Sequence, residues 1–305
     1  MHQVDNHNYQ AIKDKVSCII PSYRRCETVA RAIDSVIRQT YENIEVCVVD
    51  DNNPNDEYSL QLQNLLERYA EDSRVRYIQQ KAHINGAAAR NAGMDAACGE
   101  YIAFLDDDDE WMPTKIEKQI DMLRNNPNVD IVTTLWEIHK NGNLIRREEK
   151  YTADNLQYKI LSQEVQVGTP TILVRKDAIV GWGRFDESLL RHQDLQFLIV
   201  ILEKLKCAIV PEYLVKVHID SDMNIPSAMD LIRIKEEFFR AVQPQMGKYT
   251  EGEKKRIRNA HYYQIVYRAL REHQLILAMK YVVKAGFHYQ SVRDLVRQGM
   301  ERLKG

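Results

Sequence analysis

Residues 101–111 read YIAFLDDDDEW and join an apolar run directly to four consecutive aspartates. Residues 101–105 are short and apolar, which is typical of a buried strand, and Asp106 follows them at once. Four carboxylates at a strand end repel one another, and a divalent cation, which prefers oxygen ligands, would relieve that repulsion. A solvated acidic turn at the start of a helix near Pro113 explains the same residues. On this stretch alone, both interpretations stand.

Short apolar runs alternate with amphipathic segments through the first half of the chain. The expected strands cover residues 16–20, 44–49, 75–79, 101–105 and 131–138. The expected helices cover residues 27–38, 59–69, 86–97 and 111–124. This alternation predicts an α/β fold with right-handed crossovers and a mixed, mostly parallel sheet that helices cover on both faces.

Polar clusters follow three of the expected strands. They occupy residues 21–25, 50–53 and 106–109, and Pro21 is expected to stop the strand before it. Ligands of open α/β sheets bind beyond the carboxyl ends of the strands, so these clusters predict a nucleotide pocket at that edge of the sheet.

The character of the sequence changes at about residue 225. Before it, the chain mixes a strand over residues 171–174, a helix over 193–205 and two strands around Pro211. After it, the pattern is almost wholly helical and rich in Arg, Lys, Glu and Tyr. We therefore expect a polar N-terminal extension over residues 1–15, an α/β domain over 16–224 and a helical C-terminal appendage over 225–305.

Composition limits the classes of function. The 42 basic and 44 acidic residues give a formal net charge of -2, and no nucleic-acid-binding motif is present, so nucleic acid is not an expected partner. The five cysteines are scattered singly, which is typical of a reducing, cytoplasmic setting. No signal-peptide pattern and no run of about 18 apolar residues is found, so any membrane contact is expected to be peripheral, at the inner face.

Four motifs in a fixed order carry a family resemblance. They are PSYRR at residues 21–25, DDNN at 50–53, ARNAG at 89–93 and GEYIAFLDDDDEW at 99–111. Over residues 16–220 the chain resembles the family 2 glycosyltransferases of GT-A fold, a Rossmann-like fold of enzymes that use nucleoside-diphosphate sugars. The resemblance implies that residues 16–224 form the GT-A domain.

The resemblance implies a donor site at the strand ends. Tyr23 would flank the base, Asp51 would accept a hydrogen bond from it, and Arg90 would meet the diphosphate, because a guanidinium matches phosphate through forked donors. A surface aromatic residue and a helix-surface ion pair are the plainer interpretations of Tyr23 and Arg90. The full set implied for the nucleotide sugar is Pro21, Tyr23, Glu27, Asp51, Arg90, Asp106 and Asp107.

The acidic run resembles the family's DxD motif, which implies a Mn²⁺ or Mg²⁺ cofactor. We expect Asp108 to bind the metal and Asp107 to lie near the ribose or phosphate, while Asp109 supports them or caps the next helix. The run has one extra acid, so its alignment can shift by one place. The resemblance implies His218 as a further metal or phosphate ligand, and a plain structural histidine is the alternative.

A second segment, FDESLLRHQDL at residues 185–195, resembles the family's Phe-Asp-Glu stretch and the Glu-Asp pair that opens a helix. Inverting members use this aspartate as general base, which implies that role for Asp194. The chemistry requires such a group, because the acceptor hydroxyl must lose its proton as it attacks. Gln193 stands where a glutamate is common, so the contacts to the acceptor differ from the usual pattern.

The expected function is therefore inverting, metal-assisted transfer from a nucleoside-diphosphate sugar, with UDP-sugars favoured, to a glycan or lipid-linked glycan acceptor, as in polysaccharide biosynthesis. The alternative is a non-catalytic protein that binds nucleotide sugars as a scaffold. A nucleotidyltransferase is disfavoured, because residues 21–25 lack the glycines of its phosphate loop. Basic residues 254–258 form either a solvated helix surface or a contact for anionic lipid or a second copy of the chain.

Overall fold

The computed structural model describes residues 11–219 and 226–286, which form two compact units. Unit 1 comprises residues 11–150, 168–187 and 205–218. Unit 2 comprises the described residues among 151–167, 188–204 and 219–286. The expected extension over residues 1–15, domain over 16–224 and helical appendage over 225–305 stay predictions.

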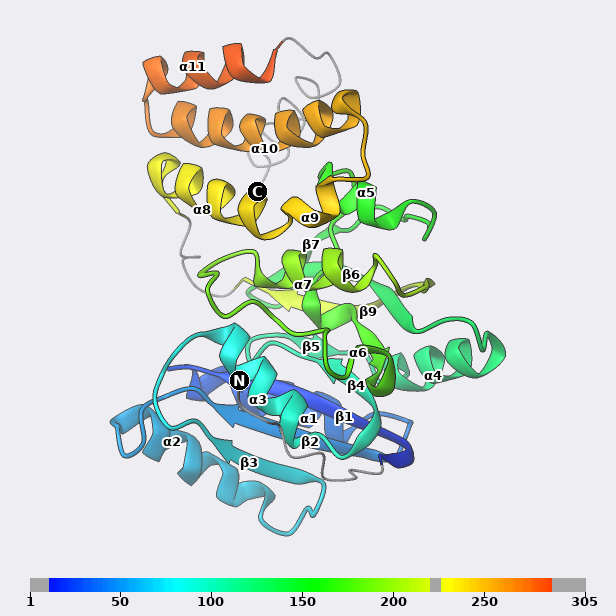
Figure 1. Ribbon diagram of the computed structural model, residues 1–305. Helices are drawn as coiled ribbons and strands as arrows, with labels where there is room; N and C mark the ends of the chain where they lie inside the picture. The colour runs from blue at the N-terminus through cyan, green and yellow to red at the C-terminus, as the bar shows by residue number, and fades with distance from the viewer. Residues whose placement is uncertain (1–10, 220–225, 287–305) are drawn as a thin grey trace, which may run out of the picture. The chain divides into compact units, whose positions relative to one another are not determined.

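Unit 1 contains a mixed, mostly parallel sheet in the order β3-β2-β1-β4-β8-β6-β9-β5, with β7 paired to β6 (Figure 1). Strands β1, β2, β3 and β4 are parallel to one another, whereas β8 is antiparallel to β4 and β6. The strands are β1 (Ile12–Ser22), β2 (Ile44–Asp50), β3 (Val75–Gln79), β4 (Gly99–Phe104), β5 (Glu110–Trp111), β6 (Ile131–Lys140), β7 (Asn143–Arg147), β8 (Leu173–Arg175) and β9 (Cys207–His218).

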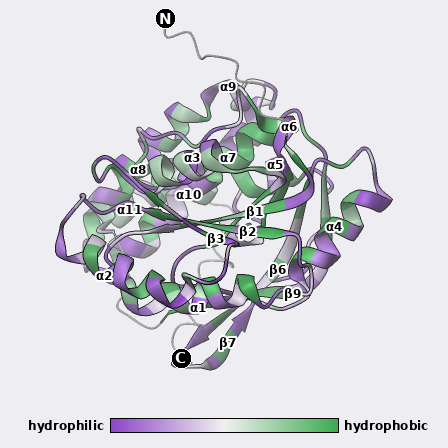
Figure 2. Cartoon of the chain, turned by 90° about the horizontal axis from the view of Figure 1, so that it is seen from below, coloured by the Kyte–Doolittle hydropathy of each residue, from purple (hydrophilic) through white to green (hydrophobic). Residues whose placement is uncertain are grey.

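Helices cover both faces of the parallel part of this sheet. In Figure 2, α1 and α3 lie on opposite sides of β1 and β2. The α-helices of unit 1 are α1 (Cys26–Ile37), α2 (Glu57–Leu66), α3 (Gly86–Ala96), α4 (Lys115–Asn125) and α6 (Lys176–Ile179). The predicted α/β fold with helices on both faces is confirmed.

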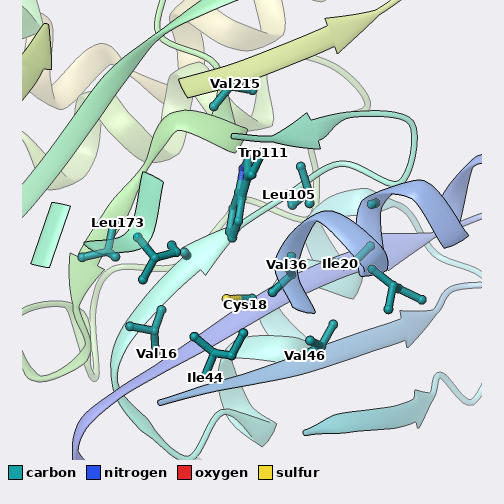
Figure 3. Close-up of a cluster of buried hydrophobic side chains, with 14 of the residues drawn as sticks. Val16, Cys18, Ile20, Val36, Ile44, Val46, Leu105, Trp111, Leu173 and Val215 are labelled. Atoms are coloured by element: carbon teal, nitrogen blue, oxygen red, sulfur yellow. The ribbon is translucent and has the colours of Figure 1, made fainter. Parts of the chain in front are cut away.

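The two faces follow from the alternation of side chains along β1. Cys18 and Ile20 join the core on the side of α1 and α4, where the ring of Trp111 lies among buried side chains (Figure 3). Ile19 points to the side of α3, and a Cβ on Gly93 would lie 2.4 Å from its Cγ2 atom. The small residues of α3 therefore let this helix pack closely against the sheet.

Unit 2 is helical. It consists of α5 (Leu156–Leu161), α7 (Gln193–Ile201), α8 (Ala228–Ala241), α9 (Gln243–Met246), α10 (Glu251–Arg271) and α11 (Leu275–Ala285). Thr250 and Glu253 form a capping box that starts α10. A small core that includes Ala228, Ile265 and Tyr281 joins α8, α10 and α11, which lie in successive layers in Figure 1.

Several predicted boundaries were wrong. Strand β1 does not stop at Pro21 but continues to Ser22, because the missing N–H of a proline does not prevent pairing at a strand end. Trp111 was expected in a helix and instead pairs as a strand with Val215, so α4 begins only at Lys115. The segment around Pro211 forms one continuous strand, β9, with two irregularities in its pairing to β6.

None of the helices in the described part of the chain combines the length and the apolar character that crossing a membrane requires.

Candidate active site

The loop after β1 brings an aromatic and a basic side chain to the carboxyl edge of the sheet. Tyr23 stacks on His83, with 3.8 Å between the ring centroids. Arg24 has a left-handed backbone, with φ of 57°, and its N–H donates to Oδ1 of Asn52 at 3.1 Å. This bond ties the loop after β1 to the loop after β2, so Tyr23 is held beside the residues that follow both strands.

Asp51 follows β2 and is buried, with 2 % exposure. Its carboxylate lies 3.0 Å from Nδ1 of His83 and accepts a bond from the N–H of Ile84. Burial raises the pKa of Asp51, and these two partners oppose that effect. Tyr23, His83 and Asp51 therefore form one group, which offers a planar stacking surface next to a hydrogen-bond acceptor.

Asp50 has a different task. Its carboxylate accepts bonds from Asn52, from the hydroxyl of Ser59 and from the hydroxyl of Tyr77, all at 2.7 to 2.9 Å. Its oxygens are thus occupied within the fold. The interpretation of Asp50 as a residue that stabilises the loop is confirmed.

Arg90 lies on α3 and reaches the acidic run. Its Nη2 donates to Oδ1 of Asp106 at 2.5 Å, and its side chain is only 13 % exposed. Its buried Nε has no hydrogen-bond partner in the described part of the chain. The neighbouring Asn91 is also buried and exchanges two hydrogen bonds with the backbone of Phe185, which fixes α3 to the segment before residue 188.

The acidic run is crowded with negative charge. Burial, followed by repulsion from Asp108, raises the pKa of Asp107 to about 7, although Arg25 opposes the shift. Burial and repulsion from Asp106 likewise raise the pKa of Asp108. Arg25 pairs with both Asp107 and Asp108. A single guanidinium therefore faces two carboxylates whose charged forms the fold disfavours.

Asp109 and His218 meet at the end of β9. Oδ1 of Asp109 accepts from the backbone N–H of His218 at 3.2 Å, and Nε2 of His218 lies 3.4 Å from Glu110. Burial, followed by repulsion from Asp106 and Asp108, raises the pKa of Asp109 well above its usual value. The expected helix-capping role of Asp109 was wrong, because α4 begins after Thr114, five residues further on.

The chemistry of this run fits a divalent cation. Carboxylate oxygens whose charge is destabilised by burial and by one another are ligands that Mg²⁺ or Mn²⁺ prefers. Across residues 11–219 and 226–286, no three His, Cys, Asp or Glu side chains are grouped so as to hold a metal ion by themselves. Phosphate and water oxygens would have to complete such a site, and the assignment of Asp108 and His218 as ligands stays a prediction.

Asp194 belongs to unit 2, in the first turn of α7, and is half-buried. The residue before the helix, His192, has a left-handed backbone with φ of 62°. Gln193 is buried and donates to the carbonyl of Leu189 at 2.5 Å, so its amide arm is used within the fold. A contact with the acceptor through this same N–H would require that bond to break.

Other predicted donor residues lie around β1. Pro21 and Tyr23 lie at its carboxyl end, whereas Glu27 is exposed in the first turn of α1. Sequence reasoning missed Arg25 and His83, which the fold brings to the acidic run and to Asp51. Both follow the carboxyl ends of strands, in the PSYRR loop and in the loop after β3, and that position was the available signal.

Comparison with known proteins shows which family the chain belongs to. The model of the family "Glycosyl transferase family 2" matches residues 17–180. An uncharacterized glycosyltransferase of Methanocaldococcus jannaschii is 30% identical over 74% of this chain and 76% of its own length. The Escherichia coli enzyme UDP-Glc:alpha-D-GlcNAc-diphosphoundecaprenol beta-1,3-glucosyltransferase WfgD is 32% identical over 52% of this chain and 59% of its own. By contrast, this chain spans only 34% of a matching uncharacterized glycosyltransferase from Rickettsia felis.

Solved structures share the fold. TarS 1-349 of S. aureus in complex with UDP-GlcNAc has a TM-score of 0.61 at 16% identity, over 93% of this chain and 92% of that one. The mannosyltransferase PcManGT of Pyrobaculum calidifontis, in complex with GDP-Man and Mn2+, has a TM-score of 0.59 at 15% identity, over 94% and 80%. The fold class is thus GT-A, and the chain belongs to glycosyl transferase family 2 and is a glycosyltransferase.

Proposed function

We propose that the protein transfers a sugar from a nucleoside-diphosphate sugar, with UDP-sugars favoured, to a glycan or lipid-linked glycan acceptor, with inversion at the anomeric carbon. The observation that carries the proposal is the acidic run after β4. Its buried carboxylates have raised pKa values and are faced by Arg25 and Arg90. Such a run needs further positive charge, and a divalent cation bound together with the donor's diphosphate would supply it.

The donor would be held in two parts. The base would lie on Tyr23 beside Asp51, whose carboxylate accepts a hydrogen bond from a ring N–H. The diphosphate would accept hydrogen bonds from the guanidinium of Arg90, whose Nε is buried and without a partner among the described residues. Asp106 would then lose part of its pairing to Arg90, which a cation would compensate.

A divalent ion fits this arrangement. Asp108, with His218 as a second candidate, would hold it, and Asp107 would lie near the ribose or phosphate. When bound, Mg²⁺ or Mn²⁺ supplies positive charge to the leaving diphosphate. The relative PcManGT was solved with Mn2+, which supports the choice of metal class.

In the transfer step, the acceptor oxygen forms a bond to the anomeric carbon from the face opposite the nucleotide. The bond from that carbon to the diphosphate oxygen breaks, and the nucleoside diphosphate leaves with the electron pair. The carboxylate of Asp194 takes the acceptor's proton. Arg25 and Arg90 offset the charge that develops on the diphosphate.

The lipid-linked class of acceptor has support in a surface of unit 2. Helix α11 exposes a stripe of large apolar side chains: Leu275, Ile276, Met279 and Val283 are 64 to 88% exposed. Lys280 and Lys284 flank the stripe, and no acidic residue occurs between residues 273 and 293. We propose that this face contacts anionic lipid at the inner face of the membrane, where the apolar side chains enter the headgroup region.

That contact can be measured with vesicles. The full chain should sediment with vesicles that contain phosphatidylglycerol and stay in solution with phosphatidylcholine alone, and Ile276→Asp should abolish sedimentation. The exposed Leu60→Asp on α2 is the matched control. A homodimer formed through α11 would instead raise the mass in solution without vesicles.

The catalytic proposal is tested by UDP release. We expect the protein with Mn²⁺ to release UDP from UDP-glucose or UDP-GlcNAc in the presence of an undecaprenyl-diphosphate GlcNAc acceptor. Asp194→Asn should lower turnover by roughly 10²- to 10⁴-fold while the Kd of the donor stays within about twofold. Donor binding without transfer in the wild type would favour the scaffold alternative, and a product with retained configuration would overturn inversion.

A further inference from the structure

Lys235 is a buried lysine that the proposed reaction does not use. It lies on α8 with 2 % exposure, although lysine is almost never fully buried without a partner. Its Nζ lies 3.0 Å from Nε2 of His192, the residue that precedes α7. The charge of Asp194, two residues further on, acts on Lys235 as well. A helix from the C-terminal part of unit 2 therefore contacts the start of the helix that carries the proposed base.

Two side chains of α8 contact His192. Phe238, one turn after Lys235, packs edge-on against the imidazole with 5.6 Å between the ring centroids. Burial, followed by the charge of Lys235, lowers the pKa of His192 to about 3. The imidazole is therefore neutral at physiological pH, so its Nε2 is free to accept the hydrogen bond from Lys235.

These two contacts affect the backbone conformation of His192. His192 has a φ of 62°, in the left-handed region of the backbone. This conformation costs free energy, which contacts with the surroundings must offset. The hydrogen bond from Lys235 and the ring contact of Phe238 fix it here. Because α7 begins at the next residue, the conformation of His192 sets the direction in which the first turn, with Asp194, leaves the loop.

We propose that Lys235 is a positioning residue for the general base: its bond to His192 aims the first turn of α7, and its ammonium group stabilises the ionised carboxyl of Asp194. The proposal rests on the proposed role of Asp194 in transfer. It assigns the C-terminal helices a part in catalysis, whereas the sequence suggested only packing and surface contact.

The titratable and charged groups that interact with Lys235 and His192 come from α7, the loop before it and α10. His192 and Asp194 face Lys235 from the start of α7, Arg191 acts on His192 from the loop before it, and His261 lies nearby on α10. Burial lowers the pKa of His261 well below its usual value and that of Lys235 to about 7, a shift that the Asp194 carboxylate opposes. Asp194 is thus the acid that favours the charged form of Lys235 against the effect of burial.

The experiment compares Lys235→Met, which removes both the hydrogen bond and the charge, with Lys235→Arg, which keeps both. Arg240→Met, at an exposed position of the same helix, is the control. We expect Lys235→Met to lower kcat about 10- to 100-fold, to leave donor Kd within about twofold, and to move the acid limb of the pH profile of kcat to higher pH. Lys235→Arg should restore part of kcat, and Arg240→Met should change none of these.

A second measurement does not depend on transfer. The change in Tm caused by Lys235→Met should differ by about 2 °C or more between the wild-type and the Asp194→Asn backgrounds, since residues that interact do not contribute additively. If the wild type transfers no sugar, the proposed function fails and the inference fails with it; if it does transfer sugar, non-additive Tm changes separately support the inference. Unchanged kcat and acid limb in Lys235→Met, or additive Tm changes, would overturn it.

Discussion

The two units each bury a lysine, and they surround it differently. Lys115 in unit 1 is fully buried, donates to Oε1 of Gln119 at 3.0 Å and lies 3.7 Å from the ring centroid of Trp111. Lys235 in unit 2 contacts His192 and feels the charge of Asp194. Burial lowers the pKa of both lysines to about 7.

The difference separates a structural charge from a functional one. A lysine among Trp, Gln and Cys side chains serves the packing of its own surroundings, and its long aliphatic stem fills the core as a hydrophobic residue would. A lysine that contacts His192, two residues before the proposed general base Asp194, can affect that carboxylate. Burial and a lowered pKa are common to both lysines and therefore do not distinguish their roles. The neighbouring carboxylate, Asp194, is what distinguishes Lys235 from Lys115.

The largest expected difference between the two lysines is in turnover. Lys235→Met should reduce kcat strongly, whereas Lys115→Met should keep kcat and donor Kd within about twofold, because Lys115 contacts Gln119 and Trp111 in the core of unit 1. Parallel assays of UDP release with the two variants measure this. Equal losses of kcat in the two variants would mean that any buried lysine affects the reaction, whether or not it lies near Asp194.

A smaller effect is expected on stability. The folded-state pKa of Lys115, about 7, is below its ordinary value of 10.5, so the unfolded chain binds more protons between these pH values. The contribution of Lys115 to the unfolding free energy should therefore rise with pH across this window, by on the order of 1 kcal/mol per pH unit. Lys115→Met should remove that contribution, leave the similar one of Lys235, and stabilise the protein at pH 7, as urea unfolding at pH 7 and 9.5 can show.

The control for this experiment is Lys118→Met on the same helix. Lys118 is only half-buried and pairs with Glu212 near the surface, where such pairs contribute little. Its removal should leave the pH dependence as in the wild type. A wild-type protein whose stability does not change between pH 7 and 9.5 would contradict the description of Lys115.

The smallest expected effect concerns the acidic run, where the unfolding free energy should change with pH in the opposite direction. The pKa of Asp107 is about 7 in the fold and 3.8 ordinarily, so the folded state binds more protons between these values. Stability should fall as pH rises from about 4 to 7, and Asp107→Asn should flatten this fall. Differential scanning calorimetry without metal or donor, with the exposed Asp121→Asn as control, measures it. An identical slope in both variants would contradict the raised pKa.

The placement of Pro21, Asp51 and Asp106 at one edge of the sheet was predictable from the sequence, because it depends on local order. Each lies at or within two residues of the carboxyl end of a parallel strand, and such ends meet at one edge of the sheet. Arg25 and His83 were not identified, since their partners lie more than 30 residues away along the chain. Lys235 was out of reach for the same reason: on α8 it appears in the sequence as one more basic residue of a helix.

The clamp between Asn91 and Phe185 has a mechanical consequence. An amide that exchanges two hydrogen bonds with a single backbone residue resists rotation as well as separation. We therefore expect α3, which carries Arg90, and residue 185 to move together. From Glu187, the end of that anchored segment, to Asp194 there are seven residues. An extended chain of that length spans at most about 25 Å, so Asp194, the proposed base, stays within that distance of Glu187 whatever path the intervening loop takes.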